Sequence, residues 1–268
     1  MKIRRAQSSD FEIILTLWQE SFCDSREYIE NFWRFWNEDD VVLLLENDYR
    51  VIGMIHLLPC RLEPNQDAYY WYAACITKEE RNKGYFRFFV TETIKALQQD
   101  GKASLCYPAA GLENFYQSCG FRYPYLQEEQ ILTKRGQYTP TNTMIEDADP
   151  SDFTHFWDKE GTCLWSKTAL QYAFFENLSC DGKQFKVIIN DQSYVGVAIQ
   201  RDGYYEINHT NLSQELIETI QNSLFDYLQC EKILCRTYES SGKYLQVLAG
   251  LSDSPLVTHW SALPFNLS

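Results

Sequence analysis

The chain has 268 residues, which is enough for one large domain or two smaller ones. Its hydrophobic fraction of 45% and aromatic fraction of 15% exclude a disordered chain, because such a composition can bury a large core. The net charge of −13 makes nucleic acid a poor partner, since an acidic surface repels the phosphate backbone.

Targeting segments and metal-binding patterns are not evident in the sequence. No apolar run reaches the roughly 18 residues of a membrane-spanning helix, and residues 1–5 lead into polar residues. We therefore expect a cytoplasmic protein with no membrane partner. The 9 cysteines lack the C-x-x-C spacing of zinc sites, and their odd number fits reduced thiols. The 4 histidines show no metal-ligand spacing either, so no metal is expected.

The first elements that the pattern predicts are a strand, a capped helix and a hairpin. Residues 3–6 form the expected strand, and residues 8–10 supply the Ser and Asp side chains that commonly begin a helix. Two apolar segments, 41–45 and 50–55, are separated by a short polar turn. This arrangement predicts a β-hairpin.

A strand, a glycine loop and a helix follow, and this order builds a phosphate-binding cradle. The apolar residues 68–76 predict a buried strand, and residues 86–99 have the apolar spacing of a helix. At Gly84 the backbone can approach a ligand without a Cβ in the way. Backbone amides at the helix start would face an anion, and Arg81 and Lys83 add positive charge. Alone, such a loop is weak evidence, because ordinary strand-to-helix turns look similar.

A second motif follows the next predicted strand, residues 103–107. Residues 111–120 predict a short helix that ends in a glycine, and residues 115–121 read F-Y-x-x-x-G-F. Together with the R-x-x-G loop at residues 81–84, this segment resembles the GNAT superfamily of N-acetyltransferases. The resemblance covers roughly residues 1–135. It implies an α/β fold whose mixed, mostly antiparallel sheet is flanked by helices, and an acyltransferase that moves an acetyl group from acetyl-CoA to a primary amine.

The resemblance also implies the residues that hold the cofactor. The backbone of Ala74, Cys75 and Ile76 would pair with the pantetheine arm of acetyl-CoA. The pyrophosphate loop would consist of Arg81, Asn82, Lys83, Gly84, Tyr85 and Phe86. The family usually has Gly or Ala where this chain has Phe86, and only a side chain pointing at the phosphate would block the site. The alternative is a vestigial loop that no longer binds CoA.

Tyr116 matches the family's general acid, which protonates the departing CoA thiolate after an amine has attacked the thioester. A phenol has a pKa of about 10 in water, so it is protonated at neutral pH and can donate to sulfur. Alternatively, Phe115 and Tyr116 only pack a short helix. Many family members carry a glutamate as general base six residues before the position of Ile76, where this chain has Tyr70. The base stays unassigned: a water chain, bulk solvent, or a carboxylate from elsewhere, such as that of the terminal Ser268.

The second half of the chain echoes the first. Residues 146–153 mirror residues 4–11, and Gly196 follows Gly53 at nearly the same offset. We therefore predict a tandem duplication of the fold, with chance similarity among amphipathic helices and turns as the alternative.

The predicted second copy lacks a cofactor loop, because no glycine occurs between Gly203 and Gly242. There a strand at 204–209 leads to Ser213, which would cap the next helix. Proline and small polar residues at 136–142 indicate the boundary. The predicted domains are residues 1–138, a GNAT domain with the CoA site, and residues 139–268, a degenerate GNAT-like domain. This plan is also similar to the N-terminal part of the enhanced intracellular survival acetyltransferases, without their additional C-terminal domain.

The acidic charge lies mainly in the second half. Residues 139–268 hold 8 basic and 17 acidic residues, against 16 and 20 in residues 1–138. A cationic amine acceptor, either a small molecule or a peptide, would be drawn to this surface, but solubility alone also explains it. Two other functions stay open: a non-catalytic CoA-binding sensor or scaffold, and a tRNA-dependent aminoacyl transferase, against which the acidic balance argues. The motifs identify neither the acceptor nor the oligomeric state.

Overall fold

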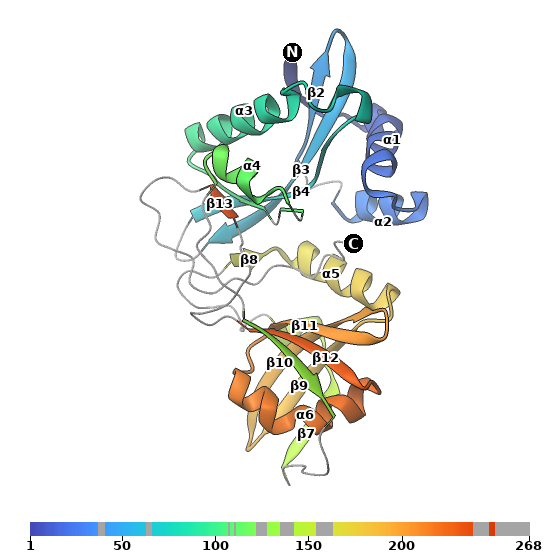
Figure 1. The fold of residues 1–268 in the computed structure, drawn as a ribbon, viewed down its shortest axis with the longest axis vertical. Coiled ribbons are helices and arrows are strands. Elements are labelled where there is room, and N and C mark those ends of the chain that lie inside the picture. The colour runs from blue at the N-terminus through green and yellow to red at the C-terminus, as the bar shows by residue number, and fades with distance from the viewer. Residues whose placement is uncertain are drawn as a thin grey trace. The chain divides into compact units, whose positions relative to one another are not determined.

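The computed structural model describes residues 1–36, 41–62, 66–106, 108–109, 111–121, 128–134, 142–153, 163–237 and 247–249. These residues form two compact units, and each unit contains a β-sheet flanked by helices (Figure 1). No helix in this part of the chain is long and apolar enough to cross a membrane.

The sheet of the first unit has the strand order β1-β2-β3-β4-β5-β13, in which β4 and β5 are parallel and the other neighbours antiparallel. Its strands are β1 (Lys2–Arg5), β2 (Val41–Asn47), β3 (Arg50–Leu62), β4 (Gln66–Ile76), β5 (Ala103–Cys106) and β13 (Val247–Ala249). Its helices are α1 (Phe11–Phe22), α2 (Arg26–Trp36), α3 (Tyr85–Gln99) and α4 (Glu113–Ser118), with the 3₁₀ turns η1 (Ser8–Asp10) and η2 (Lys78–Glu80).

The elements that the sequence predicts in this unit are confirmed, with small shifts at their ends. The β2–β3 hairpin turns at Asp48 and Tyr49, which have positive φ angles of 49° and 64°, as a tight hairpin requires. The predicted strand at 103–107 is observed to Cys106, and Tyr107 lies outside the described residues.

Helices cover both faces of the first sheet. On one face α3 buries Phe89 and Val90 in a cluster that includes Trp71 of β4. On the other face Trp18 of α1 lies 5.7 Å, centroid to centroid, from the ring of Tyr72. Adjacent residues of β4 thus serve opposite faces, as the period of two in a strand requires. Burying each such side chain stabilises the unit by about 1.5–3 kcal/mol.

The second sheet has the strand order β6-β12-β11-β10-β9-β7, in which β11 and β12 are parallel. The strands are β6 (Glu128–Thr133), β7 (Thr143–Asp147), β9 (Lys183–Ile189), β10 (Gln192–Arg201), β11 (Tyr204–Thr210) and β12 (Lys232–Thr237). The remaining elements are η3 (Pro150–Phe153), β8 (Cys163–Trp165), α5 (Lys167–Ser179) and α6 (Gln214–Leu228). An antiparallel run, a helix and a parallel strand thus occur in the same order as in the first unit.

The sequence echo corresponds to repeated local structure. The Asp10 carboxylate accepts a hydrogen bond from the Gln7 amide at 2.7 Å, and Asp152 accepts one from the Asp149 amide at 2.9 Å. Both contacts begin a short 3₁₀ turn. Gly53 and Gly196 both lie in tight packing, where an added Cβ would clash with the Ile76 side chain and the Phe185 ring, respectively.

The sheets take strands from both sides of residue 138. β6 precedes that residue yet pairs with β12 in the second sheet, and β13 follows it yet pairs with β5 in the first. Each pairing satisfies backbone groups that a bare strand edge would leave open. Residues 136–141 of the expected boundary lie outside the described residues, so the division into domains 1–138 and 139–268 stays a prediction.

Candidate active site

The candidate site lies where β4 extends beyond its parallel partner. The pairing of β4 with β5 runs from Ala68 to Trp71, while β4 continues to Ile76. Ala73 has a φ of 45°, and the β3–β4 register shifts at this point, which marks a β-bulge. The backbone of residues 74–76 therefore lies past the last pair with β5. An extended ligand could add its own hydrogen bonds at such an edge.

The Cys75 side chain belongs to the core. Its thiol is buried and donates a long hydrogen bond to the Leu17 carbonyl of α1, with the sulfur 3.7 Å from the oxygen. Burial raises the pKa of Cys75 to about 11, so the group is a neutral thiol at physiological pH. Only the backbone of Cys75 would then be available to a ligand.

The loop between β4 and α3 depends on two backbone conformations with positive φ. Asn82 has a φ of 63° and Gly84, which precedes the first residue of α3, a φ of 83°. A Cβ added at Gly84 would meet no atom within 4 Å. Glycine is thus needed there for its left-handed conformation, because other L-residues are strained in it. The space in front of Gly84 is open.

The first turn of α3 has backbone donors that no residue of the helix satisfies. No side chain caps this helix, and its first turn contains no acidic residue. The first helical bond runs from the Phe88 amide to the Gly84 carbonyl at 3.1 Å, so the amides of residues 85–87 have no partner within the helix. These donors and the helix dipole favour an anion at this position.

Arg81 connects the loop to its surroundings. Its Nε donates to the Ile76 carbonyl at 3.1 Å, and its Nη2 donates to the Ser21 hydroxyl of α1 at 3.3 Å. The Glu20 carboxylate accepts a hydrogen bond from the Lys78 amide. The last turn of α1 therefore holds the loop, a long-range contact that no local sequence pattern predicts. Lys83, half exposed, lies 2.9 Å from Glu80.

Tyr116 lies on α4 among other rings. The ring centroids of Phe115 and Phe121 are both 5.3 Å from its own. Burial, followed by the nearby thiols of Cys106 and Cys119, raises the pKa of Tyr116 well above 10. Its hydroxyl has no hydrogen-bond partner among the described residues. The phenol therefore stays protonated, and its donor is not used within this part of the chain.

The Phe86 ring packs on α4. It stacks on Phe115 with a centroid distance of 5.2 Å and an interplanar angle of 17°, and it meets Tyr116 edge-on at 6.3 Å. The structure thus brings the start of α3 together with Tyr116. The backbone amide of Phe86 remains among the open donors of the first helical turn.

The general base stays unassigned. Tyr70 is 2% exposed in β4, and Ser268 lies outside the described residues. In the described part of the chain no group of three His, Cys, Asp or Glu side chains could hold a metal ion.

Comparison with known families decides what this site belongs to. The family model described as an acetyltransferase (GNAT) domain matches residues 2–123, which include the loop, the start of α3 and Tyr116. Residues 2–123 belong to the GNAT acetyltransferase family. No curated protein matches the sequence.

Solved structures resemble both units of the chain. A probable N-acyltransferase from Enterococcus faecalis V583 has a TM-score of 0.72 and 11% identity, and covers 92% of this chain and 72% of its own. A GCN5-related N-acetyltransferase from Anabaena variabilis ATCC 29413 has a TM-score of 0.70 and 13% identity, with the same coverages. A tandem GNAT protein from the clavulanic acid biosynthesis pathway has a TM-score of 0.54 and 11% identity, and covers 94% of this chain and 99% of its own.

At these identities the likeness concerns the fold. It confirms the predicted fold class, an α/β protein with two tandem GNAT-like units whose sheets are mixed and mostly antiparallel.

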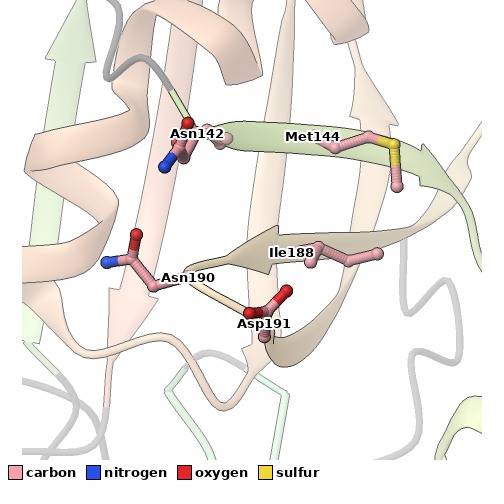
Figure 2. A pocket seen from close by; sticks show the side chains of 6 residues that line it. Asn142, Met144, Ile188, Asn190 and Asp191 are labelled. Carbon is pink, nitrogen blue, oxygen red and sulfur yellow. The ribbon is translucent and has the colours of Figure 1, made fainter.

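The second GNAT-like unit has a separate pocket of about 490 Å³ between β7 and the turn that joins β9 to β10 (Figure 2). Met144 and Ile188 pair across β7 and β9 on its wall, and Asn142, Asn190 and Asp191 also line it. It shares no residue with the candidate site described above.

Proposed function

We propose that the chain is an N-acetyltransferase that transfers an acetyl group from acetyl-CoA to a primary amine within one ternary complex. The observation that carries this proposal is the uncapped start of α3 beside the open end of β4. An extended cofactor with a pyrophosphate needs both features, a strand edge for its arm and free amides for its charge.

The chain's residues would hold acetyl-CoA mainly through their backbone. The edge formed by residues 74–76 would pair with the pantetheine arm, and the amides of residues 85–87 would hold the pyrophosphate. Arg81 keeps the two parts in place through its bond to the Ile76 carbonyl, and Lys83 can turn from Glu80 toward phosphate.

Bound acetyl-CoA would supply the thioester. The amine nitrogen would form the new C–N bond with the thioester carbonyl carbon, the C–S bond would break, and the electron pair of the C–S bond would go to sulfur. A backbone N–H near Cys75 or Ile76 would stabilise the carbonyl oxygen as it gains charge. Tyr116 would donate its proton to the sulfur. A raised phenol pKa makes full transfer to a thiolate, whose usual pKa is about 8.5, uphill. The phenolate therefore has to regain a proton from the amine nitrogen through solvent as the step completes.

Direct transfer fits the cysteines beside the site. An acyl-cysteine intermediate needs a thiolate, which forms where positive surroundings lower the pKa. Burial instead raises the pKa of Cys75, Cys106 and Cys119. None of these three thiols is suited to be a nucleophile at neutral pH.

Calorimetry with acetyl-CoA and a CoA-release assay over a panel of amines test the proposal. We expect binding and amine-dependent release of CoA, with cationic amines favoured by the acidic charge of the chain. Binding without transfer across the panel would support the alternative, a non-catalytic CoA sensor, which the tyrosine at position 70 in place of a carboxylate favours. Absence of binding would leave only a scaffold.

A further inference from the structure

Phe86 connects the start of α3 with the aromatic side chains of α4. Its amide belongs to the first turn of α3, and its ring contacts the rings of Phe115 and Tyr116 on α4. Arg87 strengthens the same junction, since its Nη1 donates to the Ser118 hydroxyl at 2.9 Å and its guanidinium lies over the Phe115 ring at 5.3 Å. Cofactor loop and acid therefore share a common support.

Tyr116 depends on ring packing for its orientation. No hydrogen bond from the described residues fixes its hydroxyl, so the rings around it determine where the phenol points. Phe115 is its neighbour in α4. Phe121 closes the following turn, because its amide donates a hydrogen bond to the Tyr116 carbonyl at 3.1 Å. Of these three rings, that of Phe86 alone comes from the cofactor-binding helix.

We propose that Phe86 is a positioning residue: its ring, stacked on Phe115 and edge-on to Tyr116, fixes the phenol relative to the start of α3. This inference rests on the proposed function. It gives the bulky residue at this loop position a task of its own, because a Gly or Ala there would leave the side of the Tyr116 ring without this contact. Removing the ring would leave the amide donors of α3 in place while the phenol gains freedom.

The matched comparison is Phe86→Ala against Phe88→Ala. Both phenylalanines are partly buried in α3 and pack on the same core cluster, but of the two it is Phe86 whose ring contacts Tyr116. We expect Phe86→Ala to lower kcat about 10- to 100-fold with little change in the KM for acetyl-CoA, because small misplacement of a catalytic group costs up to about 100-fold. Phe86→Tyr should restore kcat, and Phe88→Ala should leave it near the wild-type value.

A double variant separates positioning from loss of structure. If Phe86 acts through Tyr116, adding Phe86→Ala to Tyr116→Phe should lower kcat little further, because the acid is already missing. Equal falls in both backgrounds, or equal effects of Phe86→Ala and Phe88→Ala, would overturn the proposal. A loss of acetyl-CoA affinity that matches the loss of turnover would also overturn it, because Phe86 would then shape the loop and not the acid.

A readout without turnover keeps this test independent of the proposed function. The ¹³C resonance of the Tyr116 phenol, assigned as the signal lost in Tyr116→Phe, can be titrated with pH in tyrosine-labelled protein. We expect its pKa to fall toward 10 in Phe86→Ala and to stay raised in Phe88→Ala. An inactive wild type would refute the proposed function while this titration still decides the role of Phe86, and an unchanged Tyr116 titration in Phe86→Ala would refute that role.

Discussion

The helix that precedes the parallel strand of each sheet begins differently in the two units. α3 starts after Gly84 in a left-handed conformation, and no side chain caps it. α6 starts after Ser213, whose hydroxyl accepts a hydrogen bond from the Leu216 amide at 3.2 Å. The same topological position thus leaves its donors open in one unit and satisfies one of them internally in the other.

The ends of the preceding strands differ in the same way. In the second unit the Thr210 hydroxyl donates to the Val195 carbonyl at 2.8 Å, and the Asn211 side chain accepts from the Val195 amide at 2.9 Å. In the first unit the residues after Trp71 extend past β5, with a bulge at Ala73. In the second unit side chains satisfy backbone groups near the strand end, whereas in the first unit the strand extends past its parallel neighbour.

The largest expected effect is that of Tyr116→Phe. Because a general acid contributes about 100- to 10,000-fold, we expect kcat to fall by that range, while calorimetry shows nearly unchanged CoA affinity. Since the pKa of Tyr116 is raised well above 10, wild-type kcat should show no loss from phenol ionisation below about pH 10. Wild-type turnover in the variant would mean that Tyr116 only packs α4. The difference between the two units would then have no link to catalysis.

Gly84→Ala should have the next largest effect. A Cβ at Gly84 meets no neighbour, so the cost is the left-handed φ of 83°, about 1–2 kcal/mol for a non-glycine residue. If the loop shifts to relieve this strain, the amides of α3 move and CoA affinity should fall about 10-fold, as measured by calorimetry. Unchanged affinity would mean that the start of α3 does not hold the cofactor. Gly203→Ala, at a φ of 79° in the second unit, is the matched control.

The sequence predicted the strand, loop and helix around this candidate site well, because the signal for each is local. The strand ending at Ile76, the loop with Gly84 and the start of α3 lie within one short segment, so periodicity and one glycine specify them. The cap at Ser213 was predicted for the same reason. Each of these features depends on neighbours in the sequence.

Long-range contacts were not predictable in the same way. The hydrogen bond from the Lys78 amide to the Glu20 carboxylate joins residues 58 positions apart. Neither segment has a sequence pattern that predicts contact with the other. The direction of the Phe86 ring depends on where α4 packs, which no helical pattern states. The pairing of β13 with β5 depends on which strand edge is open once the sheet has formed.

Ser213→Ala tests the other side of the comparison. Losing the serine cap should destabilise the protein by about 1 kcal/mol, measured by chemical denaturation. We expect no effect on CoA affinity or kcat, because the proposed CoA site lies at α3 in the first unit. A fall in CoA affinity at full stability would show that the second unit takes part in binding and that the division of tasks is wrong.

The smallest expected effect concerns what the two units kept in common. Arg4 bonds to the Asp10 carboxylate and holds its pKa below the usual value, and the Asp149 amide, followed by Lys186, does the same for Asp152. A lowered folded-state pKa contributes stability above the unfolded pKa of about 3.9, and this contribution is lost as the pH falls through the folded value. Asp10→Asn and Asp152→Asn should therefore each lower the melting temperature at pH 7, and less so at pH 3.

Because each aspartate accepts a hydrogen bond from the amide just before its 3₁₀ turn and pairs with a cation, the two variants should behave alike and leave CoA affinity intact. A selective loss of CoA affinity in Asp10→Asn would mean that the first unit uses even this repeated contact for its cofactor. Equal effects would place the divergence of the two units at the helix starts, where a side chain satisfies one amide of α6 and none of α3.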